Sequence, residues 1–185
     1  MSMSTSASQE PGPSDRTRQA AIVVEISNTQ GFLDVNADSL ARLVEGILRD
    51  EGIEHATISV ALVDNATIRR INRKHLAHDW PTDVISFTLS ASGEPELVGE
   101  LVVSTEMAAA TANEVSAEPA AELSLYVVHG LLHLCGYDDL TEPDIHEMRA
   151  RESTHLKRHG LISTFPLVEL SRPGREGQEQ ATWSG

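Results

Sequence analysis

Two histidines and an aspartate in the segment HGLLHLCGYDDL, residues 129–140, are spaced to hold a metal ion. His129 and His133 are four residues apart in a stretch of strong helical character, so their imidazoles should lie on one helix face, one turn apart. Gly136 can adopt the left-handed conformation that ends a helix, and the returning chain would then bring Asp139 to the same point. The pattern H-x-x-x-H-x-x-G-x-x-D therefore predicts a metal site with His129, His133 and Asp139 as its ligands.

Three protein ligands that leave a fourth position to water are typical of a catalytic rather than a structural zinc site. Zinc lowers the pKa of its bound water to about 7 and offsets negative charge that develops on a phosphoryl oxygen. We therefore expect one zinc ion as the cofactor, in a hydrolytic role.

Other interpretations of this segment use the same residues differently. A bare pair of histidines on an apolar helix is often part of a core, but the added glycine and carboxylate favour a metal site. Asp138 is an alternative to Asp139 as the third ligand, and His146 is a more distant candidate. Cys135 would be a good zinc donor as a thiolate, but its position two residues after His133 turns it to another side of the helix, where we expect a buried apolar thiol.

A local concentration of basic residues lies upstream, within an otherwise acidic chain. The formal net charge is −14, which opposes binding to a polyanion unless cations gather locally. Four cations fall within six positions, and we consider them as RNA-binding residues: Arg69, Arg70, Arg73 and Lys74. The alternative for this cluster is a solvated helix face.

The elements that must position these residues follow from hydrophobic periodicity. A β-branched run at 20–27 indicates a largely buried strand, the alternation at 55–63 a half-buried one, and two further strands are expected at 83–90 and 99–104. Apolar residues at helical spacing predict a helix from Asn36 to a stop at Gly52, and Asp64 or Asn65 should cap a helix that ends near Leu76. The second half predicts helices around TEMAAATANEV, PAAELSLYVVHGLLHLCG and TEPDIHEMRARESTHLKRHG.

Four strands and about five helices in this unequal alternation predict an α+β or mixed α/β layer fold, with the metal site on the helix that carries H-x-x-x-H. We expect a disordered tail at 1–19, a single domain at 20–165 and a second tail at 166–185. One cysteine excludes an intrachain disulfide, and no stretch approaches the roughly 20 apolar residues of a membrane span. A cytoplasmic protein without a membrane partner is expected; the sequence leaves the oligomeric state open.

The metal segment resembles the signature of the YbeY family, which has the form H-G-x-L-H-L-x-G-Y-D-H. Residues 129–138 match it at every specified position. Asp139 stands where the family has a third histidine. Carboxylate oxygen is an acceptable zinc donor, but it adds a negative charge that should make the bound water less acidic.

A second YbeY-like block, N-x-x-Y-R-x-x-D-x-P-T-D-V-L-S-F, is similar to the segment from Asn72 to Phe87. The family arginine associated with activity and RNA contact is replaced by Leu76, so its role cannot be transferred. Pro81, Thr82 and Asp83 are retained, and they either line a cleft or form the turn into a strand.

The resemblance extends from about residue 22 to 161, and GELVVS at 99–104 is similar to the family's GDIVIS strand. It implies an α+β fold, in which a small mixed four-stranded sheet is packed with about five helices and the helix with two histidines lies against the sheet. It also implies a zinc-dependent, single-strand-specific endoribonuclease in 16S rRNA 3′-end maturation and small-subunit quality control, with rRNA and the small ribosomal subunit as partners. Asp83 and Asp138 are the candidate catalytic carboxylates.

Two other functions share these features. A metalloprotease also uses paired histidines, but its general-base glutamate would occupy position 130, where this chain has Gly130. A ribosome-associated assembly factor with weak or absent hydrolysis is the other alternative, and the substitutions Leu76 and Asp139 favour it.

Overall fold

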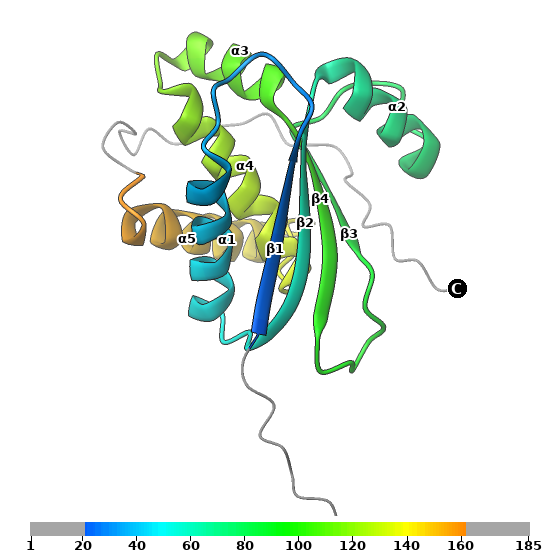
Figure 1. The fold of residues 1–185 in the computed structure, drawn as a ribbon, viewed down its shortest axis with the longest axis vertical. Coiled ribbons are helices and arrows are strands. Elements are labelled where there is room, and N and C mark those ends of the chain that lie inside the picture. The colour runs from blue at the N-terminus through cyan, green and yellow to red at the C-terminus, as the bar shows by residue number, and fades with distance from the viewer. Residues whose placement is uncertain (1–20, 162–185) are drawn as a thin grey trace, which may run out of the picture.

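A mixed four-stranded sheet lies at the centre of the computed structural model, which describes residues 21–161. Its strands are β1 (Ala21–Asn28), β2 (His55–Val63), β3 (Val84–Thr88) and β4 (Leu97–Ser104). The strand order is β1-β2-β4-β3, with β1, β2 and β4 parallel and β3 antiparallel to β4 (Figure 1). The predicted mixed sheet is confirmed.

The described residues form five helices: α1 (Ala37–Asp50), α2 (Asn65–Leu76), α3 (Thr105–Val115), α4 (Pro119–Leu134) and α5 (Glu142–Arg158). Four of them begin at a side chain that accepts a hydrogen bond from a backbone N–H of the first turn, namely Asn36, Asp64, Ser104 and Thr141. Such caps satisfy donors that have no partner inside the helix. Together with the mixed sheet, these five helices confirm the predicted α+β class.

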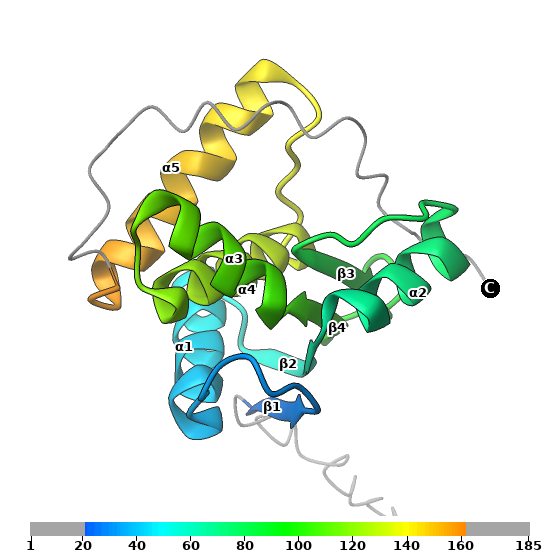
Figure 2. The ribbon, with the colours of Figure 1, turned by 90° about the horizontal axis from the view of Figure 1, so that it is seen from above.

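The helices cover the two faces of the sheet unequally. On one face, α1 and α4 pack against the strands, and buried side chains such as Ile47, Leu62, Leu101 and Leu131 form the main core between them. On the other face, α2 packs over β3 and β4 through a smaller apolar cluster that includes Ile68 and Phe87. Viewed from above, α5 lies beyond α4, so α4 is enclosed between α5 and the sheet (Figure 2).

Close packing of α4 on the sheet depends on Gly130. A Cβ at this position would lie 2.8 Å from Val84 Cγ2 and 3.0 Å from Leu101 Cδ2, so only glycine permits this approach. The Ser86 hydroxyl also donates a hydrogen bond of 3.0 Å to the Gly130 carbonyl. The contact holds the C-terminal part of α4, which carries His129 and His133, close to β3 and β4.

One expectation about burial was wrong. The strand at 20–27 was expected to be largely buried, but β1 is an edge strand whose side chains alternate between exposed and half-buried, and Val23 is 49% exposed. At this edge of the sheet α1 packs against one face of β1, and the side chains on its other face are exposed. The predicted tails at 1–19 and 166–185 lie outside the described residues. Within residues 21–161, the helices are too short or too polar to cross a membrane.

Candidate metal centre

His129 and His133 lie one turn apart on the last two turns of α4. Their rings meet edge to face, and the two Nε2 atoms are 3.1 Å apart. Both side chains are largely buried, at 9% and 10% exposure, because α4 is enclosed by the sheet and α5. A helix therefore presents two imidazole nitrogens to one point, as the spacing predicts.

The turn after α4 brings Asp139 to the same point. Gly136 has φ +97°, and the Tyr137 N–H donates to the Leu132 carbonyl while the Gly136 N–H donates to the His133 carbonyl. This is the Schellman arrangement, in which a residue of left-handed conformation reverses the chain at a helix end. The Asp139 carboxylate then lies 3.8 Å from His129 Nε2 and 3.9 Å from His133 Nε2.

The outer ring nitrogens of both histidines are held by acceptors. His129 Nδ1 lies 2.7 Å from Glu152 Oε1 on α5, and His133 Nδ1 lies 3.0 Å from the Tyr137 carbonyl oxygen. Because a carboxylate and a carbonyl only accept, each Nδ1 carries the proton that it donates. With the Nδ1 proton held in this way, the Nε2 atom of each ring points toward the other ring and toward Asp139 and is the atom available to a metal ion.

These atoms suit a divalent cation. Two imidazole nitrogens and a carboxylate converge on one point, and a cation placed between them would be attracted by all three. At metal–ligand distances of about 2.1 Å, neighbouring ligand atoms of a tetrahedral site are about 3.4 Å apart, close to the spacing here. Burial, and then the charge of His129, lowers the pKa of His133 below its usual value, although Asp139 acts in the opposite direction. The lowered pKa favours the neutral imidazole, which is the form that binds a metal ion.

Other candidates for the metal site lie outside this group of atoms. Asp138 uses Oδ1 to accept the Asp139 N–H, at 2.8 Å. His146 is exposed on α5. Burial, and next the charge of Glu51, raises the pKa of Cys135 to about 12, so its thiol is protonated at neutral pH. Among the described residues, only Asp50, His155 and His159 form another such group.

Asp83, the other predicted catalytic carboxylate, is buried at the start of β3. It is 2% exposed, its Oδ1 accepts a 3.0 Å hydrogen bond from the Thr82 hydroxyl, and its carbonyl accepts one from the Ser104 N–H. These contacts hold the turn that joins residues 81–83 to the sheet. They fit the turn interpretation of Pro81, Thr82 and Asp83.

The basic residues of α2 are exposed but partly paired. Arg69 Nε lies 2.9 Å from Asp79 Oδ1, and Arg73 Nη1 lies 3.8 Å from the same oxygen. Arg70 donates to the Thr67 hydroxyl within the helix. Asp79 therefore neutralises part of the cluster, while Arg70 and Lys74 form no ion pair within residues 21–161.

Sequence reasoning missed two residues near these features. Glu152 orients His129 from a helix 23 positions further along the chain, and no local spacing relates the two. Trp80 is 55% exposed and stacks on His78 with ring centroids 4.5 Å apart, after the basic helix. An exposed tryptophan beside a basic cluster is the signal that could have identified it.

Comparisons with known proteins cover most of this chain and agree with its fold. The family model described as endoribonuclease YbeY matches residues 25–160. The endoribonuclease YbeY of Rhodopirellula baltica is 42% identical over 79% of this chain and 76% of its own length, and that of Bacillus licheniformis is 34% identical over 76% and 97%. The solution structure of a Thermotoga maritima protein, 27% identical, superimposes with a TM-score of 0.55 over 75% of this chain and 89% of its own.

Proposed function

Because the chain belongs to the endoribonuclease YbeY family, we propose that it is a zinc-dependent endoribonuclease that cleaves single-stranded RNA. We further propose that it acts in the cytoplasm on the 3′ end of 16S rRNA and in quality control of the small ribosomal subunit. The observation that carries the proposal is the convergence of His129 Nε2, His133 Nε2 and the Asp139 carboxylate.

His129, His133 and Asp139 would hold the ion. A divalent cation there supplies Lewis-acid chemistry, since it acidifies water and offsets negative charge on a phosphate. Glu152 and the Tyr137 carbonyl keep the protons of the two histidines on Nδ1, so that both Nε2 atoms remain available as donors of electron pairs. α5 is therefore part of the site, although it contributes none of the three ligands.

Asp138 is the better placed of the two carboxylates proposed for proton transfer. It precedes Asp139 directly, and its charge acts on His133. The Asp139 N–H fixes Asp138 Oδ1, which leaves Oδ2 to take a proton from water. Asp83, with its 2% exposure and its bond from Thr82, has a positioning role at the start of β3 in this proposal.

The basic residues and Trp80 support an RNA substrate. Arg70 and Lys74 offer positive charge to phosphates, and Arg69 and Arg73 would join them when phosphate competes with Asp79. Trp80 is 55% exposed and stacks on His78, so its indole offers an aromatic surface for an unpaired base. Stacking of this kind requires bases that are not in a duplex, which favours single-stranded RNA.

The geometry at Gly130 opposes the metalloprotease alternative. In the protease pattern a glutamate after the first histidine serves as general base. Here a side chain at position 130 would point into Val84, Leu101 and Ser86 of the sheet. This position has neither a carboxylate nor the space for one.

Leu76 favours the assembly-factor alternative. It stands where the family block has an arginine, and it packs with Ile68 and Phe87 in the apolar cluster beneath α2. A missing phosphate-binding arginine costs about 2.7 kcal/mol or more of transition-state stabilisation, which lowers the rate about a hundredfold. Binding to the ribosomal subunit would then persist with slow cleavage.

Incubation of the protein with single-stranded RNA, duplex RNA and casein, each with and without a chelator, separates these functions. We expect cleavage of the single-stranded RNA alone, its loss on chelation, and its absence in His133→Ala. Casein cleavage would instead support the protease. If all substrates stay intact while the protein sediments with small ribosomal subunits, the assembly-factor function holds.

A further inference from the structure

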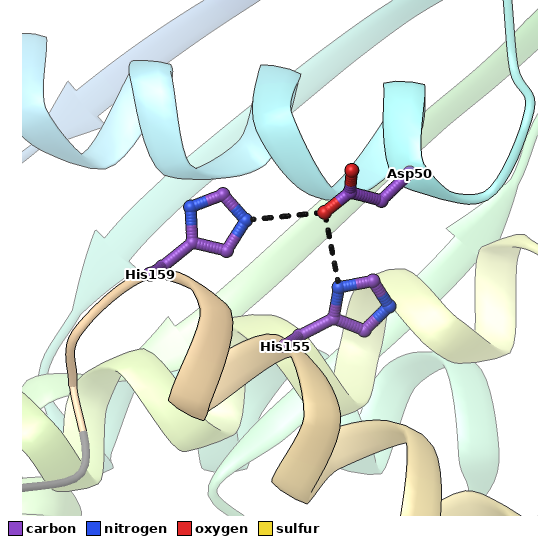
Figure 3. Close-up of side chains that lie close together, drawn as sticks. All are labelled: Asp50, His155 and His159. Atoms are coloured by element: carbon purple, nitrogen blue, oxygen red, sulfur yellow. Dashed lines mark ion pairs between the residues drawn. The ribbon is translucent and has the colours of Figure 1, made fainter.

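A second group of metal-ligand side chains joins the C-terminal ends of α1 and α5 (Figure 3). Asp50 is the last residue of α1, and His155 and His159 are four residues apart at the end of α5. Asp50 Oδ2 lies 3.8 Å from His155 Nδ1 and 3.6 Å from His159 Nε2. The three residues are distinct from the candidate metal centre formed by His129, His133 and Asp139.

The nitrogens that face Asp50 have no hydrogen bonds. His155 is 1% exposed, and its Nε2 donates to Glu51 Oε1, whereas its Nδ1 is buried without a hydrogen-bond partner within the described residues. His159 Nε2 is likewise buried and without a hydrogen-bond partner in that part of the chain. Both atoms are directed toward the same carboxylate oxygen at distances too long for a hydrogen bond (Figure 3).

These separations match those expected around a small cation. Ligand atoms of a tetrahedral zinc site lie about 3.4 Å apart, since each is about 2.1 Å from the ion. The distances from Asp50 to the two histidines are also close to those from Asp139 to His129 and His133. A carboxylate on the far ring nitrogen is common for metal-bound histidine, and Glu51 holds that position on His155.

Arg158 contacts one oxygen of Asp50, and the two histidines face the other oxygen. Arg158 Nη1 binds Asp50 Oδ1 at 2.7 Å, while the histidines face Oδ2. Burial by itself would raise the pKa of Asp50, but the Arg158 hydrogen bond and the charges of Arg158, His159 and His155 hold it below its usual value. Asp50 is therefore ionised at neutral pH, as a metal ligand must be.

Gly46 makes room for one of the rings. It lies in α1, one turn before Asp50, and a Cβ there would be 2.5 Å from His159 Cε1. An alanine would favour the helix, because glycine in a helix interior costs about 1 kcal/mol relative to alanine. The absence of a side chain at position 46 is what allows His159 to lie against α1 and to reach Asp50.

We propose that Asp50, His155 and His159 form a second binding site for a divalent transition-metal ion such as Zn²⁺. Two imidazole nitrogens and one carboxylate oxygen are a donor set that zinc accepts. The ion would clamp the end of α1 to the end of α5. Because α5 also carries Glu152, the partner of His129, the clamp would hold that helix in place beside the candidate metal centre.

Titration of the untagged protein with Co²⁺, followed by its visible absorption, tests the proposal in a His133→Ala background that removes the other site. We expect one Co²⁺ per chain, displaced by Zn²⁺, and loss of this binding when His159→Ala is added. His146→Ala is the matched control, because His146 is exposed on the same helix and should leave binding unchanged. Circular dichroism checks that every variant is folded.

Two further variants test the same site without changing a histidine. Asp50→Asn should weaken Co²⁺ binding at least tenfold, and Gly46→Ala should weaken it by displacing the His159 ring. If folded His133→Ala binds no Co²⁺, or binds it equally well with and without His159, the proposal is overturned and the group is a polar cluster that holds no metal ion. This result does not depend on whether the protein cleaves RNA.

Discussion

At the scale of single residues, the contacts of the ring nitrogens distinguish His129 and His133 from two histidines that merely pack in a core. His129 and His133 are buried, which would suit core residues, but their Nε2 atoms face each other and Asp139. Hydrogen bonds from the Nδ1 atoms to Glu152 and to the Tyr137 carbonyl determine this orientation. The spacing predicts the three ligands, whereas Glu152 was not predictable because only the packing of α5 on α4 brings it near.

Removal of Glu152 tests this orienting contact. In Glu152→Ala the His129 ring loses the acceptor for its Nδ1 proton, so we expect zinc affinity at the candidate metal centre to fall about 10–100-fold. Competition with a chromophoric chelator measures the affinity. Glu147→Ala, an exposed change on the same helix, should have no effect. Equal affinities for both variants would show that the contact does not orient the ligand.

Exchange of Asp139 tests the third ligand. Asp139→Ala should lower zinc affinity at least tenfold, whereas Asp139→His, which restores the histidine of the family signature, should retain binding. Asp138→Ala serves as the control, since its carboxylate lies outside the group. Zinc content after dialysis against a weak chelator separates the variants. A loss in Asp138→Ala with retention in Asp139→Ala would assign the ligand to Asp138 instead.

At the scale of elements, periodicity and caps predict the helices and strands well. α4 is predicted because apolar residues fill it almost entirely, and Gly136 ends it as expected. Strand order and the exposure of β1 were not predictable in this way, because a β-branched run has the same composition in an edge strand and a central one. The contact of α4 with β3 depends on one missing side chain, at Gly130.

Gly130→Ala tests that contact. The added methyl group would overlap Val84 and Leu101, so we expect the free energy of unfolding to fall by about 1–3 kcal/mol despite the gain in helix propensity. Urea denaturation followed by circular dichroism gives the value. Gly46→Ala, whose Cβ meets only the movable His159 ring, is the control and should be neutral or stabilising. A Gly130→Ala variant as stable as the wild type would contradict the need for glycine at this contact.

The basic face of α2 predicts a salt-dependent interaction with RNA. Arg70→Ala combined with Lys74→Ala should reduce the slope of log affinity against log salt by about 1.4, because each phosphate that a cation neutralises on a single strand contributes about 0.7. Fluorescence anisotropy with a labelled single-stranded RNA measures the slope. Arg149→Ala, an exposed change on α5, should not alter it. An unchanged slope in the double variant would place the RNA elsewhere.

At the scale of the whole molecule, α5 connects the sites to the core. Its residue Glu152 binds His129, Arg151 and His155 both bind Glu51, and Arg158 binds Asp50. The end of α1, the end of α5 and the candidate metal centre are thus joined by charged side chains. In a chain with a net charge of −14, these pairs give Asp50 and Glu51 cationic partners.

Glu51 predicts how stability depends on pH. Burial alone would raise its pKa, but hydrogen bonds from Arg151, His155 and Tyr137 hold it below the usual 4.5. A depressed pKa in the folded state stabilises the fold above pH 4.5, and this contribution is lost as the pH falls through the lower folded-state value. Glu51→Gln should therefore cost about 3 kcal/mol at neutral pH, and the difference from wild type should narrow in acid.

Urea denaturation at neutral pH and at about pH 3 measures this difference. Glu54→Gln, an exposed change four residues after the end of α1, is the control, and its free energy of unfolding should equal that of the wild type at both pH values. If Glu51→Gln lowers the free energy of unfolding by the same amount at both pH values, the ionised Glu51 does not contribute to stability through Arg151 and His155 as described.

The central claim, that His129, His133 and Asp139 hold an ion on which RNA cleavage depends, is tested most directly by a zinc titration of metal-free protein with cleavage of a single-stranded RNA as the readout. We expect that cleavage rises with zinc and saturates, that His146→Ala, an exposed change on α5, behaves as the wild type, and that His133→Ala loses at least about a hundredfold in rate. Cleavage by metal-free protein, or by His133→Ala at the wild-type rate, would contradict it.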